Sequence, residues 1–486
     1  MVSADNVHLD VLELIFAYLS GSDLASIALV SRSFFAGVIP RLYSTLLFRL
    51  THAKRYMSII SPFAAVALHP ELGVHVRYID IRTVPIVKSQ YHPKFLKETT
   101  LALSLCPNII SFRCSTPALP PFISTLQSKG RLRDLRINAT LTSEQSTMLV
   151  KLEGIRNLTL DFASWNLLNM LPKWTGSLTG LTTLTLFMAQ ELNDIVLESV
   201  VQQLPALVGL HVVGCSKVDH VVVLGLLSHT PDLQSLSMTT GEGNRILPTP
   251  PPHLPHLRHL ALDTRLSASQ PPSTTVISSI LTYLSPPGLG SLPATTSTYT
   301  FDFSAPPPTL PLPSMGPRLE SFIVRYPDRQ MSIPATLTTQ LAAMHGSSLR
   351  SVSFIDCVLG VHDALPALLK GCTKLERLEV ALPIRDMTIF TAAIAHSRTL
   401  RVLVDVEAHS TSAHNPRPSL TQDTVRHLFV SVPTLGKVVV EGTRVWTRGK
   451  LAMGRLGVSL DRKMSTSAMA GRMAGTGMHW FMPREA

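Results

Sequence analysis

The sequence has few cysteines, few charged residues and no long apolar run, and each shortage excludes a class of protein. Its 486 residues include only five cysteines, at positions 106, 114, 215, 357 and 372. Their spacing gives neither a disulfide framework nor a zinc-binding pattern, so we expect free thiols in a reducing compartment. No apolar run approaches the roughly 18 residues of a membrane span, and the first residues lack the features of a secretory signal. We therefore expect no membrane partner.

Charge is also in short supply. Charged residues make up 15% of the chain, too few for a coiled coil or a highly charged disordered protein. The formal net charge of +11 raises the alternative of a nucleic-acid-binding protein. Lys and Arg are scattered, however, without a basic run and without interleaved aromatic residues. We expect no nucleic-acid partner, and a location in the cytoplasm, the nucleus or both.

The motifs of common catalytic sites are missing. The sequence contains no G-x-S-x-G, no G-x-x-x-x-G-K-[ST] and no H-E-x-x-H. It has eighteen histidines, but His253, His256 and His259 have no acidic residue or cysteine at metal-ligand spacing. We therefore expect no catalytic residues, no cofactor and no bound metal, and conclude that the chain is not an enzyme.

What the chain does have is a repeated pattern of apolar residues at positions 1, 4 and 6 of each copy. From residue 109 to residue 257 the copies begin 23, 23, 26, 26, 26 and 24 residues apart. A period in the mid-twenties with the pattern L-x-x-L-x-L is typical of leucine-rich repeats. The clear copies begin at residues 76, 109, 132, 155, 181, 207, 233, 257, 319, 349, 375 and 435, with a looser copy at 400.

Each copy is followed by residues that read as a helix where the pattern is clear, for example 191–204, 221–228 and 364–370. Because one strand and one helix cannot bury their own apolar face, the units must stack into a solenoid with a parallel sheet. Cys215 and Cys357 fall on the consensus cysteine position, so we expect them to be buried and unreactive. The alternative is an ordinary α/β domain with leucine-rich strands.

A window at about 247–317 interrupts the period and holds sixteen of the 36 prolines. We expect an insertion made of loops or polyproline II around one buried unit, with a helix at 276–284 and a strand at 298–303. The segment 446–486 is basic, and we expect it to be disordered.

The N-terminal residues 7–48 have a different pattern. Apolar residues with helical spacing reach Leu19, Gly21 interrupts them, and a second stripe and a third short segment follow before Pro40. Three short helices enclose little core, so we expect this hairpin to dock on a partner or on the chain behind it. A generic amphipathic helical hairpin is the alternative to any more specific interpretation.

The residues that carry a recognisable motif in this stretch are Val7, Leu12, Ile15, Phe16, Leu19, Asp23, Leu24, Val30, Ser31, Arg32 and Phe34. In these residues the stretch resembles an F-box. The departure from the family pattern is His8, where the family usually has proline. With residues 69–81 added, the layout resembles the F-box/leucine-rich-repeat proteins of basidiomycete fungi.

The expected fold is therefore of the α/β class. A three-helix F-box at 1–48 precedes an irregular leucine-rich-repeat solenoid at 49–445, with parallel strands on the concave face and helices outside. The solenoid carries the Pro-rich insertion at 247–317, and the basic tail of 446–486 follows.

The resemblance implies the substrate-recognition subunit of an SCF-type cullin–RING E3 ubiquitin ligase. Its F-box would bind a Skp-family adaptor, and its solenoid would bind an unidentified target protein. The alternative is a leucine-rich-repeat scaffold that is not engaged with a ligase. The residues expected to contact the adaptor are Val7, His8, Leu12, Ile15, Phe16, Leu19, Leu24 and Val30.

The target would bind the concave strand face, where outward side chains alternate with the buried residues of the repeats. For any one of these outward residues, an ordinary solvated surface position is the alternative. The candidates for binding the target are Arg136, Asp161, Phe187, His211, Arg325, Arg377 and Glu379.

Overall fold

The computed structural model describes residues 9–19, 21–241, 245–264, 274–285, 318–327, 331–406, 420–440, 444–452, 455–462 and 480–483. By their contacts the residues divide into two units, which are described separately. Unit 1 comprises Met1–Leu204, Cys215–Lys217 and Met469–Thr476, and unit 2 comprises Pro205–Gly214, Val218–Ala468 and Gly477–Ala486. Val7, His8, residues 298–303 and most of the Pro-rich window lie outside the described residues.

Unit 1 begins with three short helices, as expected, α1 (Leu9–Phe16), α2 (Gly21–Ile27) and α3 (Arg32–Leu42). Helix α3 does not end before Pro40, as the sequence analysis expects, but includes it. Ser31 caps α3, since its hydroxyl oxygen accepts a hydrogen bond from the backbone N–H of Phe34 at 3.2 Å. Such a cap satisfies one of the N–H groups that a helix start leaves unpaired.

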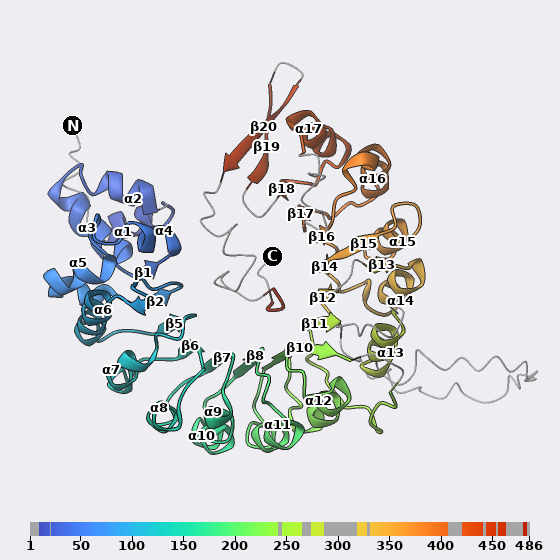
Figure 1. Ribbon diagram of the computed structural model, residues 1–486. Coiled ribbons are helices and arrows are strands. Elements are labelled where there is room, and N and C mark those ends of the chain that lie inside the picture. Colours follow the sequence, from blue (N-terminus) through green and yellow to red (C-terminus); the bar gives the residue numbers. More distant parts are fainter. Residues whose placement is uncertain are drawn as a thin grey trace, which may run out of the picture. The chain divides into compact units, whose positions relative to one another are not determined.

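The rest of unit 1 alternates short parallel strands with helices, and Figure 1 shows the helices on one side of the strands. We call the other side of the sheet its open face. The strands are β1 (Thr45–Phe48), β2 (Tyr78–Ile81), β5 (Ser111–Cys114), β6 (Asp134–Asn138), β7 (Asn157–Asp161) and β8 (Thr183–Phe187), paired in this order. The helices are α4 (Leu50–Lys54), α5 (Pro62–Leu68), α6 (Pro93–Leu105), α7 (Ile123–Gln127), α8 (Ser143–Leu149), α9 (Trp165–Leu168), α10 (Leu171–Ser177) and α11 (Asp194–Val201), with 3₁₀ helices η2 (Pro70–His75) and η3 (Pro120–Phe122) and a small hairpin of β3 (Ile86–Val87) and β4 (Gln90–Tyr91).

Unit 2 continues the same alternation, again with helices on one side of its sheet (Figure 1). Its parallel strands are β9 (Gly209–Val213), β10 (Ser235–Thr240), β11 (His259–Thr264), β12 (Ser321–Arg325), β14 (Ser351–Ile355), β16 (Arg377–Val380), β17 (Val402–Asp405) and β18 (Lys437–Val440). Its helices are α12 (His220–Leu226), α13 (Thr275–Tyr283), α14 (Ala335–His345), α15 (Ala364–Gly371), α16 (Met387–Ile394) and α17 (Gln422–Ser431), with 3₁₀ helices η4 (Leu227–His229) and η5 (Ile384–Asp386) and a separate strand pair of β13 (Met331–Ile333) and β15 (Cys357–Leu359).

The strand register confirms the repeat derived from the sequence. The fourth position of each copy stands beside the fourth position of the next, as Leu135 pairs with Leu158 and Leu158 with Leu184. Such stacking buries a continuous core that one copy could not form alone. In unit 2 the same row contains Leu210, Leu236, Leu260, Phe322, Val352, Leu378, Leu403 and Val438, all fully buried.

The eighth position of the repeat has a left-handed backbone in several copies. Directly after their strands, Phe162, Met188, Gly214 and Asp356 have φ values of 57°, 55°, 76° and 58°. The turn is followed by a small buried residue, which is cysteine in two copies. Cys357 donates its S–H to the carbonyl oxygen of Ile355 at 3.1 Å, and Cys215 is likewise buried. The prediction that these cysteines are buried is therefore confirmed, and the pKa of Cys357 is raised by burial, which makes its thiol unreactive.

Two segments differ from the sequence expectation or test it only in part. The expected helix at 276–284 is present as α13, and β11 pairs directly with β12, while the expected strand at 298–303 lies outside the described residues. The sequence predicts disorder from residue 446, but β18 is extended by an antiparallel hairpin of β19 (Arg444–Ala452) and β20 (Arg455–Arg462). Backbone pairing to the exposed edge of the sheet stabilises this hairpin despite its basic composition.

Gly73 of η2 lies against the end of α6. A Cβ atom at this position would lie 2.3 Å from the carbonyl oxygen of Leu105, at the end of α6. We expect Gly73→Ala to destabilise unit 1 by about 1–3 kcal/mol, since two backbone segments must separate. Thermal unfolding monitored by circular dichroism measures this loss. The matched control is Gly130→Ala, where a Cβ meets no atom within 4 Å, and equal melting temperatures for both variants would contradict the expectation.

His345, at the end of α14, is buried and its Nδ1 has no hydrogen-bond partner among the described residues. Burial lowers the pKa of His345 from 6.5 to about 4. The folded state therefore binds fewer protons than the unfolded state, so stability is complete above pH 6.5 and is lost as the pH falls towards 4. The loss for this residue alone is about 2 kcal/mol at pH 5.

His345→Leu is expected to remove this part of the pH dependence. Denaturation curves recorded at pH 7.5 and pH 5 compare the variant with the wild type. His256→Leu, at an exposed position, serves as the control and should keep the wild-type dependence. An unchanged difference between the two pH values in His345→Leu would refute the assignment.

Candidate protein-interaction surfaces

Helix α1 carries two apolar stripes, and only one of them faces the core of the helical hairpin. Leu12 and Phe16 are 2% and 3% exposed and pack with Leu24 of α2 and Val38 of α3. Phe34 of α3 closes this core with its ring edge against Phe16, the centroids 5.5 Å apart. The core of the hairpin is thus built by the helices themselves.

Leu12, Phe16 and Leu24, which the sequence analysis expects to contact the adaptor, are buried in the core of the hairpin. Their contact with an adaptor stays a prediction. Leu19 also packs partly against this core. Ile15 and Val30, in contrast, are exposed and remain candidates for contact.

The second stripe of α1 is exposed. Val11, Leu14, Ile15 and Tyr18 follow the spacing i, i+3, i+4 and i+7, which places them on one side of the helix. Leu14 is 69% exposed and Tyr18, just after the helix, is 92% exposed. Contiguous apolar side chains of this kind mark an interaction surface in a soluble protein. The exposed apolar residues of the three helices and the turn after α2 are Val11, Leu14, Ile15, Tyr18, Leu29, Val30 and Phe35.

On the open face of unit 1, the predicted target-binding residues are held by their neighbours. Arg136 of β6 and Asp161 of β7 form an ion pair, with Nε 3.1 Å from Oδ2, and both side chains are largely buried. Phe187 of β8 is half-buried and meets Phe162 edge to face, with ring centroids 6.3 Å apart. These residues form two small clusters, one ionic and one aromatic, and their role in target binding stays a prediction.

On the open face of unit 2, the predicted residues are also paired. Arg325 Nε lies 3.1 Å from Asp356 Oδ2. Arg377 Nε lies 2.7 Å from Glu379 Oε1, and the Ser353 hydroxyl donates to Glu379 Oε2 at 2.9 Å. Glu379 is 1% exposed, so it is not the solvated surface position that was the alternative for such residues.

Two of the predicted residues, His211 of β9 and Arg325 of β12, contact a distant part of the chain. His211 Nδ1 lies 2.8 Å from the hydroxyl of Ser237 on β10, and the His211 ring lies against the ring of Phe481. The segment that carries Phe481 also places the ring of Trp480 5.4 Å from the guanidinium carbon of Arg325. No pattern in the sequence indicates this contact, because residues 480–483 belong to the tail for which disorder is expected.

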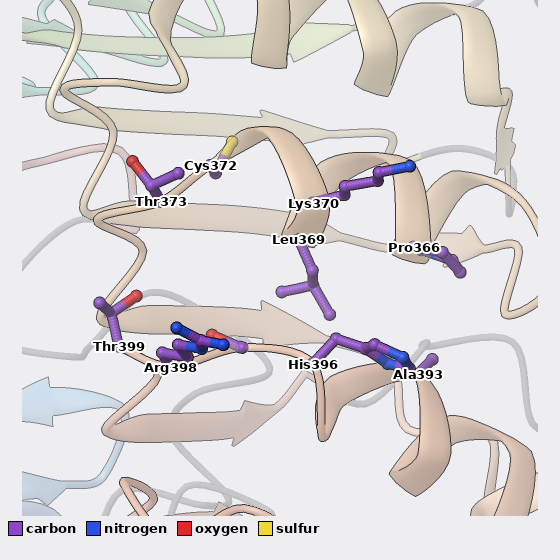
Figure 2. A pocket seen from close by; sticks show the side chains of 10 residues that line it. Pro366, Leu369, Lys370, Cys372, Thr373, Ala393, His396, Arg398 and Thr399 are labelled. Carbon is purple, nitrogen blue, oxygen red and sulfur yellow. The ribbon is translucent and has the colours of Figure 1, made fainter.

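A pocket of about 530 Å³ lies on the helical side of unit 2, between α15 and the end of α16. Figure 2 shows Leu369 of α15 beside this pocket, with His396 and Arg398 across from it. None of the residues predicted to bind the target lines the pocket. It is therefore separate from the open face.

The described part of the chain has no metal-ligand cluster and no membrane-spanning helix. Within it, no group of three or more His, Cys, Asp or Glu side chains could hold a metal ion. No helix in the same residues has the length and apolar character needed to cross a membrane.

Comparison with known proteins gives one family match. Residues 5–36 match the F-box domain. A search of the curated proteins finds no match. The solved structure described as "Crystal structure of Rad7 and Elc1 complex in yeast" is similar at 13% identity, covering 85% of this chain and 92% of that chain, with a TM-score of 0.38. A Leptospira interrogans leucine-rich-repeat protein is similar at 12% identity, covering 76% of this chain and 85% of that chain, with a TM-score of 0.28.

The chain is therefore a modular protein of the α/β class, with a helical interaction domain ahead of a repeat sheet. More narrowly, an F-box domain at its N-terminus precedes parallel strands and outer helices of the leucine-rich-repeat type. F-box domains and leucine-rich repeats are typically protein-interaction modules.

Proposed function

We propose that this chain is the substrate-recognition subunit of an SCF-type cullin–RING E3 ubiquitin ligase. Its F-box binds a Skp-family adaptor, and its leucine-rich-repeat sheet binds the protein that is to be ubiquitinated and degraded. Other subunits transfer ubiquitin, so this chain needs no catalytic residue and no cofactor. It works in the cytoplasm, the nucleus or both.

The observation that supports this proposal is the exposed stripe of α1. It lies within the residues that match the F-box domain, and it leaves large apolar side chains in water. Burying each such side chain contributes about 1.5–3 kcal/mol before the costs of association are subtracted. A helix with one stripe in its own core and another in solvent is suited to joining a partner without losing its fold.

Co-expression of the full-length chain with a Skp-family adaptor tests the proposal. We expect the two proteins to co-purify through size-exclusion chromatography, and we expect a chain lacking residues 1–48 to lose the adaptor. A folded full-length chain that never retains the adaptor would reject the ligase role. That result would favour the alternative of a leucine-rich-repeat scaffold, which makes no use of an adaptor. His8 stands where the F-box family usually has proline, and it lies outside the described residues. This experiment also tests whether adaptor binding tolerates histidine at that position.

A further inference from the structure

The C-terminal segment of the chain fills a site on the open face of unit 2. Phe481 is completely buried, although the residues before it and after it are partly exposed. Its contacts come from β9, β10 and β11, which lie more than 200 residues earlier in the chain, as the separations of 244 and 222 residues show. A short terminal segment is normally poorly ordered unless specific contacts hold it. Here the contacts are specific.

The carbonyl oxygen of Phe481 receives two hydrogen bonds from buried side chains. The Ser237 hydroxyl donates at 3.0 Å, and Nε2 of His259 lies 2.7 Å away. Since a carbonyl oxygen only accepts, His259 must carry its proton on Nε2. Ser237 has given its only proton to Phe481, so its oxygen accepts from Nδ1–H of His211 at 2.8 Å. His211 and Ser237 thus form a chain of two donors that ends on the backbone carbonyl of Phe481, and His259 donates to the same carbonyl separately.

This donor arrangement suits a peptide ligand. Without an acceptor, Ser237 and His259 would each present a buried donor with no carbonyl to receive it, which is unfavourable. The ring of Phe481 adds an apolar contact with the ring of His211, at 5.8 Å between centroids. Beside it, Trp480 stacks near the guanidinium of Arg325. The site therefore recognises a backbone carbonyl and an aromatic ring together, with a second aromatic residue before it.

Trp480 has fewer polar contacts than Phe481. Its indole N–H is buried and has no acceptor among the described residues. Burying a donor without a partner weakens the contact. The segment is therefore held mainly at Phe481.

We propose that His211, Ser237 and His259 form a peptide-recognition site for a segment with two consecutive aromatic residues, and that the chain's own Trp480–Phe481 occupies it as an internal competitor. That the natural ligand of this site is a segment of a target protein rests on the proposed function, whereas the existence of the site does not. Because the occupying segment belongs to the same chain, its local concentration is on the order of millimolar. An external peptide must overcome this competition.

The test uses full-length chains and a fluorescent peptide with the sequence of residues 477–486, Gly-Met-His-Trp-Phe-Met-Pro-Arg-Glu-Ala. Fluorescence polarisation should show at least tenfold tighter peptide binding to a Phe481→Ala chain than to the wild type. Pro483→Ala, at an exposed position of the same segment, is the matched control and should behave like the wild type. Peptide binding to the Phe481→Ala chain should fall at least tenfold when Ser237→Ala is added, or when alanine replaces phenylalanine in the peptide.

A second measurement does not depend on how well any variant folds. Hydrogen exchange of residues 480–483 in the wild-type chain should accelerate when unlabelled peptide is added in excess. Equal peptide binding by wild type and Phe481→Ala, or no binding and no change in exchange, would overturn the proposal. Co-purification of the adaptor with the Phe481→Ala chain distinguishes a failure of this proposal from a failure of the proposed function. Peptide binding without adaptor binding would keep this site and reject only the ligase role.

Discussion

Replacing Leu14 and Tyr18 together with aspartate is expected to abolish association of the full-length chain with a Skp-family adaptor. Both side chains are exposed, at 69% and 92%, so the substitutions leave the hairpin core intact. Each loses about 1.5–3 kcal/mol of apolar burial in the complex and adds a charge that must be desolvated. The sum corresponds to a loss of affinity of roughly a hundredfold or more. Isothermal titration calorimetry with purified adaptor measures it.

Two controls make this experiment specific. Ile195→Asp changes an exposed apolar residue of α11, outside the F-box, and should bind the adaptor like the wild type. Leu12→Asp changes a core residue, so it should lower the helical signal and the melting temperature as well as binding. Wild-type affinity of the Leu14→Asp/Tyr18→Asp chain would show that the exposed stripe of α1 is not the adaptor surface.

Arg377→Leu is expected to destabilise unit 2 by about 3–5 kcal/mol. The substitution leaves the carboxylate of Glu379, which is 1% exposed, without its cationic partner at 2.7 Å. Removing one partner of a buried ion pair costs more than the pair contributes, because the remaining charge stays in a medium that solvates it poorly. Chemical denaturation curves give the change in the free energy of unfolding.

The double variant Arg377→Leu/Glu379→Leu distinguishes a buried charge from a general packing defect. Without either charge, most of the lost stability should return, since an apolar pair of similar volume often replaces a buried ion pair without loss. A double variant as unstable as Arg377→Leu alone would mean that packing, and not the loss of the Arg377 charge beside Glu379, explains the loss of stability. Lys374→Leu, on the turn before β16, is a surface control and should change stability by no more than about 0.5 kcal/mol.

The repeat sheet could be predicted from the sequence because its signal is periodic and local. The spacing of Leu132, Ile155 and Leu181 sets the strand positions, and the observed register follows from stacking equivalent positions. The helices predicted within 191–204 and 364–370 are present, since their apolar residues have helical spacing. The hairpin after β18 could not be predicted because edge pairing depends on the neighbouring strand and not on composition.

The surfaces were harder to predict than the fold. Both sides of α1 are apolar, so the sequence could not show which stripe the hairpin buries. That choice depends on where α2 and α3 dock, which places Leu12 inside and Leu14 outside. The contact of Phe481 with Ser237 joins residues 244 positions apart, and no local pattern contains this information. The pairing of Arg377 with Glu379 is closer in sequence, but its burial depends on adjacent strands.

The exposed apolar stripe of α1 affects how the unassembled chain behaves in a cell. Side chains such as Leu14 and Tyr18 are exposed to water when the chain is alone, and exposed apolar surface favours self-association. We therefore expect the amount of soluble chain to depend on the amount of a partner protein that covers this stripe. The abundance of the chain would then depend more on its molar ratio to that partner than on its own rate of synthesis.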